Sequence, residues 1–420
     1  MSIMRTIALF NDSFPPLIDG VSNAVLNYAQ QIKAHYGEPV VVTPEYPYAD
    51  DSQYDFPILR YHSIDITKKL NVVAGIPYAP KQAKQLIEGN ADLLHCHCPA
   101  ASIVLARTLR DKINAPLVMT YHSKYDIDIR NVVRTKVVQD NVIGAMMESI
   151  NACDEVWAVS HGAGENLKSL GYTGDYVVME NGVDLPHERV NDAFIREVTG
   201  HYDIPEGIPV FLFAGRMMWY KGIRIIIDAL TGLMASGMDF RMVFVGKGTD
   251  FGEIQQYVRD TGLEPKVIYA GAVYDRNQIR AWYCRADVLL FPSTFDTNGL
   301  VVREAAACSL PAVLIEGSCA AEGVTDGRNG YLIAENAVAL AVKLDRICKD
   351  MDAVHRVGEN AGNEIYISWE DSIRKATERY EVVIDNYKSG RYPQRKKLTD
   401  EFFKSVGELM SFDLLEHISF

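Results

Sequence analysis

Short apolar runs alternate with amphipathic segments along the first part of the chain. Strands that alternate with helices in this way form parallel sheets whose two faces the helices cover. Buried strands are predicted at residues 6–10, 40–43, 58–61, 117–121, 154–159 and 176–179. Helices are predicted at residues 22–34, 79–88 and 163–169. The pattern therefore indicates a parallel α/β domain.

The same alternation starts again after a polar segment at about residues 185–207, which Pro186, Pro205 and Pro209 punctuate. The strands predicted there are at 210–214, 242–245, 267–271, 286–291 and 312–315, and the helices at 223–235, 278–285 and 337–350. Two α/β domains are therefore expected, at residues 1–188 and 206–367.

A third segment, residues 368–420, follows the second domain. Its first part predicts an amphipathic helix at 368–387, because Ser368 and Asp371 have the spacing of a capping box and apolar residues recur at helical spacing. Four basic residues occur within 391–397, and a second helical pattern at 401–415 carries several acidic residues. Docking of this tail on the first domain is favoured over contact with an anionic membrane.

Composition narrows the functional classes. The 420 residues, 48% of them hydrophobic, are enough for two cores, and a formal charge of −13 argues against nucleic acid as a partner. No apolar run is long enough to cross a bilayer, and the first residues lack a signal-peptide pattern. The seven scattered cysteines read as reduced core residues. A cytoplasmic protein is predicted.

The stretch 291–313 carries the strongest indication of a site. Phe291-Pro292-Ser293 ends an apolar strand, and Gly299 precedes a helical pattern that Pro311 stops. A helix that begins at the carboxyl edge of a sheet directs free backbone N–H groups at a ligand, which favours an anion. Asp296 in the loop and Glu304 in the helix could hold hydroxyl groups beside it. The alternative is an ordinary strand-to-helix connection with solvated acids.

Two cations follow the first strand of the second domain. Arg216 and Lys221 lie in the loop 215–222, which leads into the next predicted helix. Fixed cations at such a position neutralise charge that develops on a phosphate leaving group. The alternative is a solvated surface pair.

Two further positions stand out in the first domain. Gly20 lies in a loop between the first strand and its helix, where it serves either as a plain turn or as a close backbone approach to a ligand. His122 directly follows the strand 117–121, and ligands bind at the carboxyl ends of strands in open α/β sheets. The alternative for His122 is a satisfied core histidine.

The segment 95–98, His-Cys-His-Cys, suggests a zinc site. In a strand, however, His95 and His97 face one side and the two cysteines face the other. One metal ion cannot easily collect all four, so a metal site is not favoured.

In their order along the chain, these sequence motifs resemble those of the retaining glycosyltransferases of family 4, and the resemblance extends to about Tyr387. It implies the GT-B fold: α/β, with two Rossmann-like domains facing each other across a cleft and a C-terminal crossover helix. In that family, two acidic residues with seven residues between them face the nucleotide sugar. Asp296 and Glu304 have this spacing, and Asp296 stands where the pattern usually has Glu.

The resemblance also implies roles for individual residues. Catalytic roles fall on His122, Arg216, Lys221 and Asp296, with His122 and Asp296 beside the sugar and the two cations on the diphosphate. Glu304 would hold the ribose hydroxyls. A similar His-x-His-x-Pro pattern in the family would place His97 at a strand end that lines the cleft. Donor-binding roles fall on Gly20, Val21, Arg216, Lys221, Val273, Thr297, Asn298, Gly299, Leu300 and Glu304.

The implied reaction moves a hexose-type sugar from a nucleoside-diphosphate sugar, with a UDP-sugar as the expected donor. The acceptor is a hydroxyl group of a sugar or of a lipid-linked molecule, and no metal or cofactor is expected. Lys124, Arg130, Arg134 and Lys136 form a basic set that leaves peripheral contact with the inner membrane face open. The alternatives are a sugar-nucleotide epimerase, a non-catalytic nucleotide-sugar binding protein and a phosphorylase that uses pyridoxal phosphate.

Overall fold

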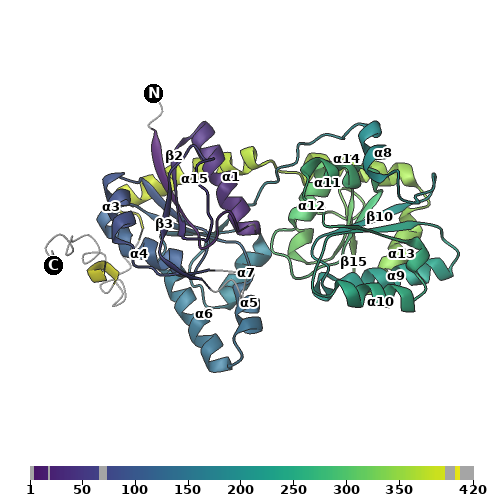
Figure 1. The fold of residues 1–420 in the computed structure, drawn as a ribbon, viewed down its shortest axis with the longest axis horizontal. Coiled ribbons are helices and arrows are strands. Elements are labelled where there is room, and N and C mark those ends of the chain that lie inside the picture. Colours follow the sequence, from purple (N-terminus) through teal and green to yellow (C-terminus); the bar gives the residue numbers. More distant parts are fainter. Residues whose placement is uncertain (1–3, 18, 66–72, 393–402, 407–420) are drawn as a thin grey trace. The chain divides into compact units, whose positions relative to one another are not determined.

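The computed structural model describes residues 4–17, 19–65, 73–392 and 403–406 (Figure 1). The chain divides into two compact units. The first unit contains Met1–Asn181 together with Trp369–Phe420, and the second unit contains Gly182–Ser368. The second unit is therefore an insertion between two parts of the first.

The first unit is built on a seven-stranded parallel sheet with the strand order β3-β2-β1-β6-β7-β8-β9. Its strands are β1 (Arg5–Phe10), β2 (Gly37–Pro44), β3 (Ile58–Tyr61), β6 (Leu93–Cys96), β7 (Leu117–Tyr121), β8 (Glu155–Ala158) and β9 (Tyr176–Val178). A separate antiparallel pair consists of β4 (Ser63–Asp65) and β5 (Val73–Gly75). The order reverses between β1 and β6, which makes that point the expected ligand crevice of this sheet.

Helices cover both faces of the first sheet (Figure 1). One face packs against α3 (Pro80–Glu88), α4 (Ala101–Ile113), α6 (Lys136–Asn151) and α7 (His161–Ser169). The other face packs against α1 (Gly20–His35) and α15 (Trp369–Lys388). The short helix α5 (Tyr125–Val132) follows β7.

Helix α15 comes from the end of the chain and completes the core of the first unit. The apolar residues that recur at helical spacing in this segment are buried, namely Ile373, Ala376, Tyr380, Val383 and Ile384. Tyr380 stacks on Trp157 of β8, with ring centroids 5.4 Å apart, and its hydroxyl lies 2.6 Å from His95 Nδ1. The first unit therefore needs residues from both ends of the sequence.

The second unit is built on a six-stranded parallel sheet with the order β12-β11-β10-β13-β14-β15. Its strands are β10 (Val210–Ala214), β11 (Arg241–Val245), β12 (Val267–Gly271), β13 (Val288–Phe291), β14 (Ala312–Ile315) and β15 (Tyr331–Ile333). The order reverses between β10 and β13. Four of these strands, β10, β11, β13 and β14, are buried along their whole length, which explains why their sequences are apolar except for Arg241.

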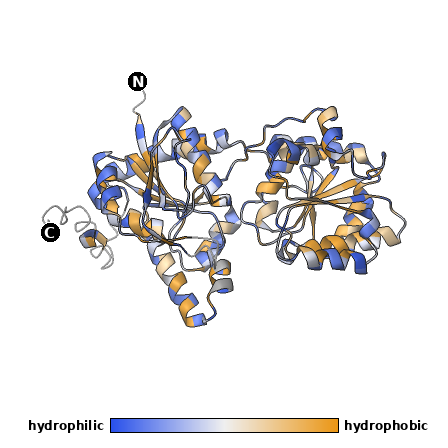
Figure 2. Cartoon of the chain, viewed as in Figure 1, coloured by the Kyte–Doolittle hydropathy of each residue, from blue (hydrophilic) through white to orange (hydrophobic). Residues whose placement is uncertain are grey.

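Figure 1 shows the helices of the second unit on the two faces of this sheet. One group is α9 (Ile223–Ala235), α10 (Phe251–Asp260) and α13 (Ala337–Ile347); the other is α8 (Asp192–Thr199), α11 (Arg276–Arg285), α12 (Leu300–Ala307) and α14 (Met351–Glu364). The short 3-10 turns are η1 (Trp219–Lys221), η2 (Glu264–Lys266) and η3 (Cys319–Ala321). Figure 2 shows the apolar strands enclosed by helices whose outer faces are polar.

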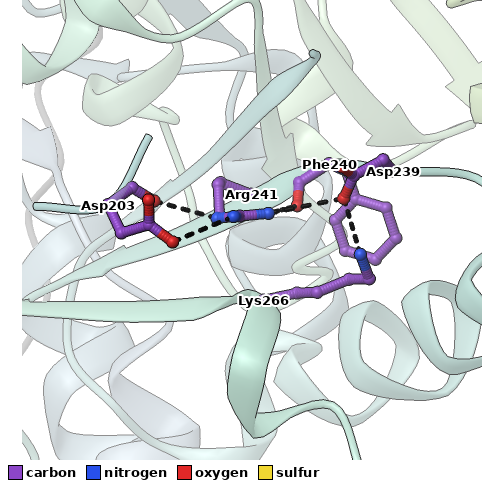
Figure 3. A network of polar contacts seen from close by, with 5 residues as sticks. All are labelled: Asp203, Asp239, Phe240, Arg241 and Lys266. Atoms are coloured by element: carbon purple, nitrogen blue, oxygen red, sulfur yellow. Dashed lines mark hydrogen bonds and ion pairs between the residues drawn. The ribbon is translucent and has the colours of Figure 1, made fainter. Parts of the chain in front are cut away.

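An ion-pair network closes the amino edge of the second sheet (Figure 3). Arg241, the first residue of β11, donates to the backbone oxygen of Asp203 at 2.9 Å and pairs with its carboxylate at 3.1 Å. On its other side it reaches Asp239, which Lys266 binds at 2.6 Å. Because this edge is opposite to the carboxyl ends of the strands, the network joins β11 to its neighbours and lies away from the expected ligand crevice.

The structure has helices α4, α5, α6 and α10 in segments for which the sequence analysis names no helix, and it differs from the prediction in further regions. The segment expected to be a linker contains α8, whose amino end is capped by Asn191 and whose Ile195 is buried in the core of the second unit. The helix expected at 337–350 ends at Ile347, and a separate helix, α14, starts after Asp350, whose side chain accepts from the Ala353 N–H.

Most of the helix expected at 401–415 lies outside the described residues. Within 403–406, Phe403 lies under the Arg107 guanidinium at 4.1 Å and Val406 packs on the first unit.

Candidate active site

The candidate ligand site of the second unit lies where the strand order of its sheet reverses. Strands β10 and β13 are neighbours, and the loops that follow them meet at the carboxyl edge of the sheet. Gly222 makes this approach possible: it has φ of 76°, and a Cβ there would lie 2.0 Å from the backbone oxygen of Pro292. The loop that carries Lys221 is thereby held against the loop that carries Asp296.

Lys221 and Asp296 form an ion pair at this point. The distance from Lys221 Nζ to Asp296 Oδ1 is 2.6 Å, and the second carboxylate oxygen accepts a hydrogen bond from Ser293 Oγ at 2.6 Å. Lys221 is 7% exposed, and its ammonium group lies 5.5–5.9 Å from the rings of Tyr220, Phe291 and Phe295. These contacts hold the buried ammonium group in place, and its binding to a second anion stays a prediction.

Helix α12 begins directly after this loop. Gly299 precedes it with φ of 61°, and a Cβ at Gly299 would contact Ala320 at about 3 Å, so the turn requires glycine. The loop residues Thr297 and Asn298 are half-buried, and Leu300 is the first residue of the helix. Helix α12 therefore begins just after the carboxyl edge of β13, as the sequence predicts, and binding of an anion at its amino end stays a prediction.

Glu304 lies on α12, and both of its carboxylate oxygens have partners. Oε1 pairs with Arg276 Nη2 at 2.7 Å, and Oε2 accepts from the hydroxyl of Tyr283 at 2.8 Å. Arg276 also pairs with Asp184. Tyr283 is 1% exposed, and burial together with the Glu304 carboxylate raises the pKa of its hydroxyl well above the ordinary value. The hydroxyl therefore stays protonated and donates to Glu304.

The sequence did not identify Arg276, Tyr283 or Ser293. Tyr283 falls within the apolar stripe of a predicted helix, so nothing in the sequence distinguishes it from a core residue. Arg276 lies before the predicted helix start at residue 278, whereas α11 begins at Arg276 because Asp275 caps it through the Gln278 N–H. The Asp275 cap was the signal that would have placed Arg276 on the same helix as Tyr283.

The remaining predicted donor residues are placed as follows. Arg216 is exposed at the end of β10, with its guanidinium 6.0 Å from the Tyr220 ring centroid. Val273 follows β12 and packs against the core of the second unit. Gly20 is the exposed first residue of α1 in the first unit. The N–H of Val21 is bound by the side chain of Asp19 at 2.8 Å, which caps α1.

Three buried histidines lie together at the carboxyl edge of the first sheet. His97 Nδ1 is 3.0 Å from His122 Nε2, and His122 Nδ1 is 3.4 Å from the side-chain nitrogen of Asn181. An amide nitrogen can only donate, so His122 Nδ1 accepts and His122 Nε2–H donates to His97. Both ring nitrogens of His122 thus face protein groups. The contact between His122 and the transferred sugar stays a prediction.

The third histidine, His95, is held by Tyr380 and by Thr120 Oγ1, the latter at 2.7 Å. His95 and His97 lie on the face that α1 and α15 cover, since both contact Tyr28, whereas Cys96 packs on the opposite face. The alternation expected of this strand is therefore present. Among the described residues, no group of three or more His, Cys, Asp or Glu side chains is arranged to bind a metal ion.

Burial of the histidines predicts acid sensitivity of the first unit. Desolvation lowers the pKa of His122 from 6.5 to about 3, and burial also lowers the pKa of His95 and His97 well below 6.5. The unfolded chain therefore binds more protons below pH 6.5, and stability that is fully present above pH 6.5 is lost as the pH falls. Burial raises the pKa of Asp12, so the folded state takes up a proton at this one group before the unfolded chain does. Asp12 therefore offsets part of the loss of stability.

We expect the free energy of unfolding of the first unit to fall by at least about 1.4 kcal/mol per pH unit between pH 6 and pH 5. The measurement is the urea midpoint of peptides from β6 and β7, read by hydrogen-exchange mass spectrometry at each pH. His62→Gln provides the control, because the side chain of His62 is 82% exposed and lies outside the buried cluster, so the loss of stability on acidification should persist in this variant. A midpoint that stays constant or rises on acidification contradicts the prediction.

Comparison with known families accounts for both units. The model described as Glycosyltransferase Family 4 matches residues 18–186, and the model described as Glycosyl transferases group 1 matches residues 195–364. The chain belongs to glycosyltransferase family 4. Members of this family transfer a sugar from a nucleotide sugar, and this is the coarse activity of the chain.

Curated relatives of this family 4 glycosyltransferase differ in their substrates. An uncharacterized glycosyltransferase of Methanocaldococcus jannaschii is 24% identical over 92% of this chain and 100% of its own length. The alpha-monoglucosyldiacylglycerol synthase of Acholeplasma laidlawii is 23% identical over 79% of this chain and 85% of its own. A GDP-mannose-dependent alpha-mannosyltransferase of Mycobacterium tuberculosis is 25% identical over 78% and 83%.

Solved structures agree on the fold. Anabaena HepE in complex with UDP superposes with a TM-score of 0.72 at 19% identity, covering 90% of this chain and 100% of that one. Two parallel Rossmann-like sheets and the C-terminal helix identify the family 4 glycosyltransferase as a GT-B protein. Within the described ranges, no helix combines the length and apolarity needed to span a bilayer.

Proposed function

We propose that this chain is a retaining hexosyltransferase that takes its sugar from a UDP-sugar and transfers it to a hydroxyl group of a sugar or lipid-linked acceptor. The observation that carries the proposal is the set of groups at the β10–β13 crevice. The Asp296 carboxylate is suited to a sugar, and the Glu304 carboxylate is suited to a ribose. The buried Lys221 ammonium group and the amino end of α12 are suited to a diphosphate. A UDP-bound structure of the similar Anabaena protein supports the choice of nucleotide.

In the proposed reaction, breaking of the sugar–phosphate bond leaves negative charge on the diphosphate. Lys221 is already fixed and desolvated, so it stabilises this charge without reorganising. Arg216 is exposed at the same strand end and adds a second cation. The proposal assigns neutralisation of the leaving group to these two side chains rather than to a metal ion.

A panel of donors and acceptors tests the proposal. The purified protein is incubated with UDP-glucose, UDP-galactose, UDP-N-acetylglucosamine or GDP-mannose, alone and with soluble sugars or diacylglycerol vesicles, and nucleotide release is measured. We expect release that depends on a UDP-sugar and an acceptor, with the donor's anomeric configuration kept in the product by NMR. Conversion of a donor without an acceptor indicates an epimerase, and saturable binding without release indicates a binding protein.

Asp296 is expected to determine how the sugar is held. Asp296→Glu adds one methylene to a side chain that Lys221 and Ser293 already fix, so the carboxylate moves toward the sugar. We expect kcat/KM for the preferred donor to fall by about tenfold or more, because one methylene in a fitted pocket is worth about 1–3 kcal/mol. UDP affinity should stay within about threefold by calorimetry.

The reciprocal variant Glu304→Asp provides the matched control for that prediction. It shortens the acid on the ribose side, so it should weaken UDP itself. If Asp296→Glu weakens UDP as much as it weakens the donor, Asp296 acts on the nucleotide and its assigned role is wrong.

A further inference from the structure

The carboxylate of Glu304 is held by two side chains of one helix. Arg276 and Tyr283 are seven residues apart on α11, so they share a face of that helix, and each contacts a different oxygen of Glu304. Tyr283 donates to Oε2 at 2.8 Å and Arg276 pairs with Oε1 at 2.7 Å. The orientation of the carboxylate is therefore set from α11.

The two partners differ in how firmly they are fixed. Tyr283 is 1% exposed and belongs to the core of the second unit, so its hydroxyl has one available position. The side chain of Arg276 is 44% exposed, and it also pairs with Asp184, a second carboxylate that is 51% exposed. Arg276 can leave Glu304 and keep a counter-ion, whereas Tyr283 cannot move without repacking the core.

This difference fits the recognition of two adjacent hydroxyl groups. An ionised carboxylate offers about four lone-pair positions, two on each oxygen. Tyr283 occupies one position on Oε2 and fixes the plane of the group, while the position on Oε1 that faces solvent is occupied by an exchangeable cation. A hydroxyl that arrives at Oε1 can replace Arg276, which remains with Asp184.

We propose that Tyr283 is a positioning residue that orients Glu304 toward the ribose of the donor, and that Arg276 is a competing counter-ion that the ribose hydroxyls displace onto Asp184. This inference rests on the proposed function of Glu304 in nucleotide binding. It adds two residues that act on ribose recognition through Glu304.

Calorimetry with deoxy nucleotides tests it. Binding of UDP and GDP, and of their 2′-deoxy and 3′-deoxy analogues, is measured for the wild-type protein and for Tyr283→Phe. We expect the wild type to bind UDP about tenfold or more tightly than at least one deoxy analogue, as for a hydrogen bond to a charged group. Tyr283→Phe should weaken UDP by about five- to thirtyfold and leave that analogue within about twofold.

Arg276→Ala is expected to change the affinity for UDP in the opposite direction. Removing the competing cation should strengthen UDP relative to the deoxy analogue by about two- to fivefold, and the exposed position should tolerate the change. Tyr331→Phe removes the hydroxyl of another buried tyrosine in the second unit, on β15, and should alter neither affinity. Arg276→Ala also tests the inference if Tyr283→Phe does not fold.

The outcomes separate the inference from the function on which it rests. If the wild type shows no discrimination with either nucleotide, Glu304 does not hold the ribose, and both fail. If GDP alone is discriminated, the UDP assignment fails and the same variants are read with GDP. If discrimination is present but Tyr283→Phe keeps it, or weakens both ligands equally, Tyr283 has only a structural role. A loss of discrimination in Arg276→Ala overturns the displacement step.

Discussion

Replacing Lys221 with alanine is expected to lower kcat/KM for sugar transfer by about 10²- to 10³-fold, the usual effect of removing one preorganised group that stabilises developing negative charge. The ammonium group is buried beside Asp296 at 2.6 Å, so its charge is not replaced by water. Initial rates of nucleotide release over a range of donor concentrations provide the measurement.

A control must separate the lost cation from the acid that the substitution leaves unpaired. The double variant Lys221→Ala with Asp296→Asn removes both charges, and we expect its rate to stay low. Lys349→Ala removes a lysine that pairs with Asp345 on the surface of the same unit and should retain the wild-type rate. Recovery of activity in the double variant would show that the isolated Asp296 charge, rather than loss of Lys221, caused the defect.

Replacing Tyr380 with alanine is expected to destabilise the first unit by about 3–5 kcal/mol, the usual cost of deleting a large buried aromatic side chain. Tyr380 is fully buried, stacks on Trp157 and binds His95, so its loss leaves a cavity and an unpaired histidine nitrogen. The urea midpoint of β6 and β8 peptides by hydrogen exchange measures the change.

Two neighbouring variants divide this effect into its parts. Tyr380→Phe keeps the stacked ring and removes only the hydroxyl, so we expect about 1–3 kcal/mol, the cost of leaving His95 Nδ1 unsatisfied. Val382→Ala changes an exposed position on the same helix and should stay within about 0.5 kcal/mol of the wild type. An equal loss in Tyr380→Phe and Tyr380→Ala would assign the whole effect to the hydrogen bond.

The features that could be predicted from the sequence are those that depend on residues close together in the chain. The strands, the turn before α12 and the buried face of α15 follow from apolar runs, Gly299 and helical spacing, because each depends on residues that are close in the chain. Asp296 lies in the loop before α12 and Glu304 lies on α12, as the sequence indicates, and their roles in donor binding stay predictions. The family resemblance is confirmed by the matches to both units.

The partners of these acids could not be predicted, because they come from elements that meet only through the sheet. Tyr283 and Arg276 reach Glu304 from α11, and Lys221 reaches Asp296 from the loop after β10. Similarly, the contact of His122 with Asn181 joins residues 59 positions apart. Such pairs depend on strand order, which spacing alone does not determine.

The insertion of the second unit between α7–β9 and α15 has a consequence for biosynthesis. A ribosome working from the amino terminus completes the whole of residues 182–368 before it emits Trp369–Lys388. The second unit can fold as soon as it leaves the exit tunnel, whereas the first sheet must wait with the surface around Tyr28 and Trp157 uncovered. The apolar face that α15 covers therefore stays exposed on the nascent chain for the time needed to translate nearly two hundred codons.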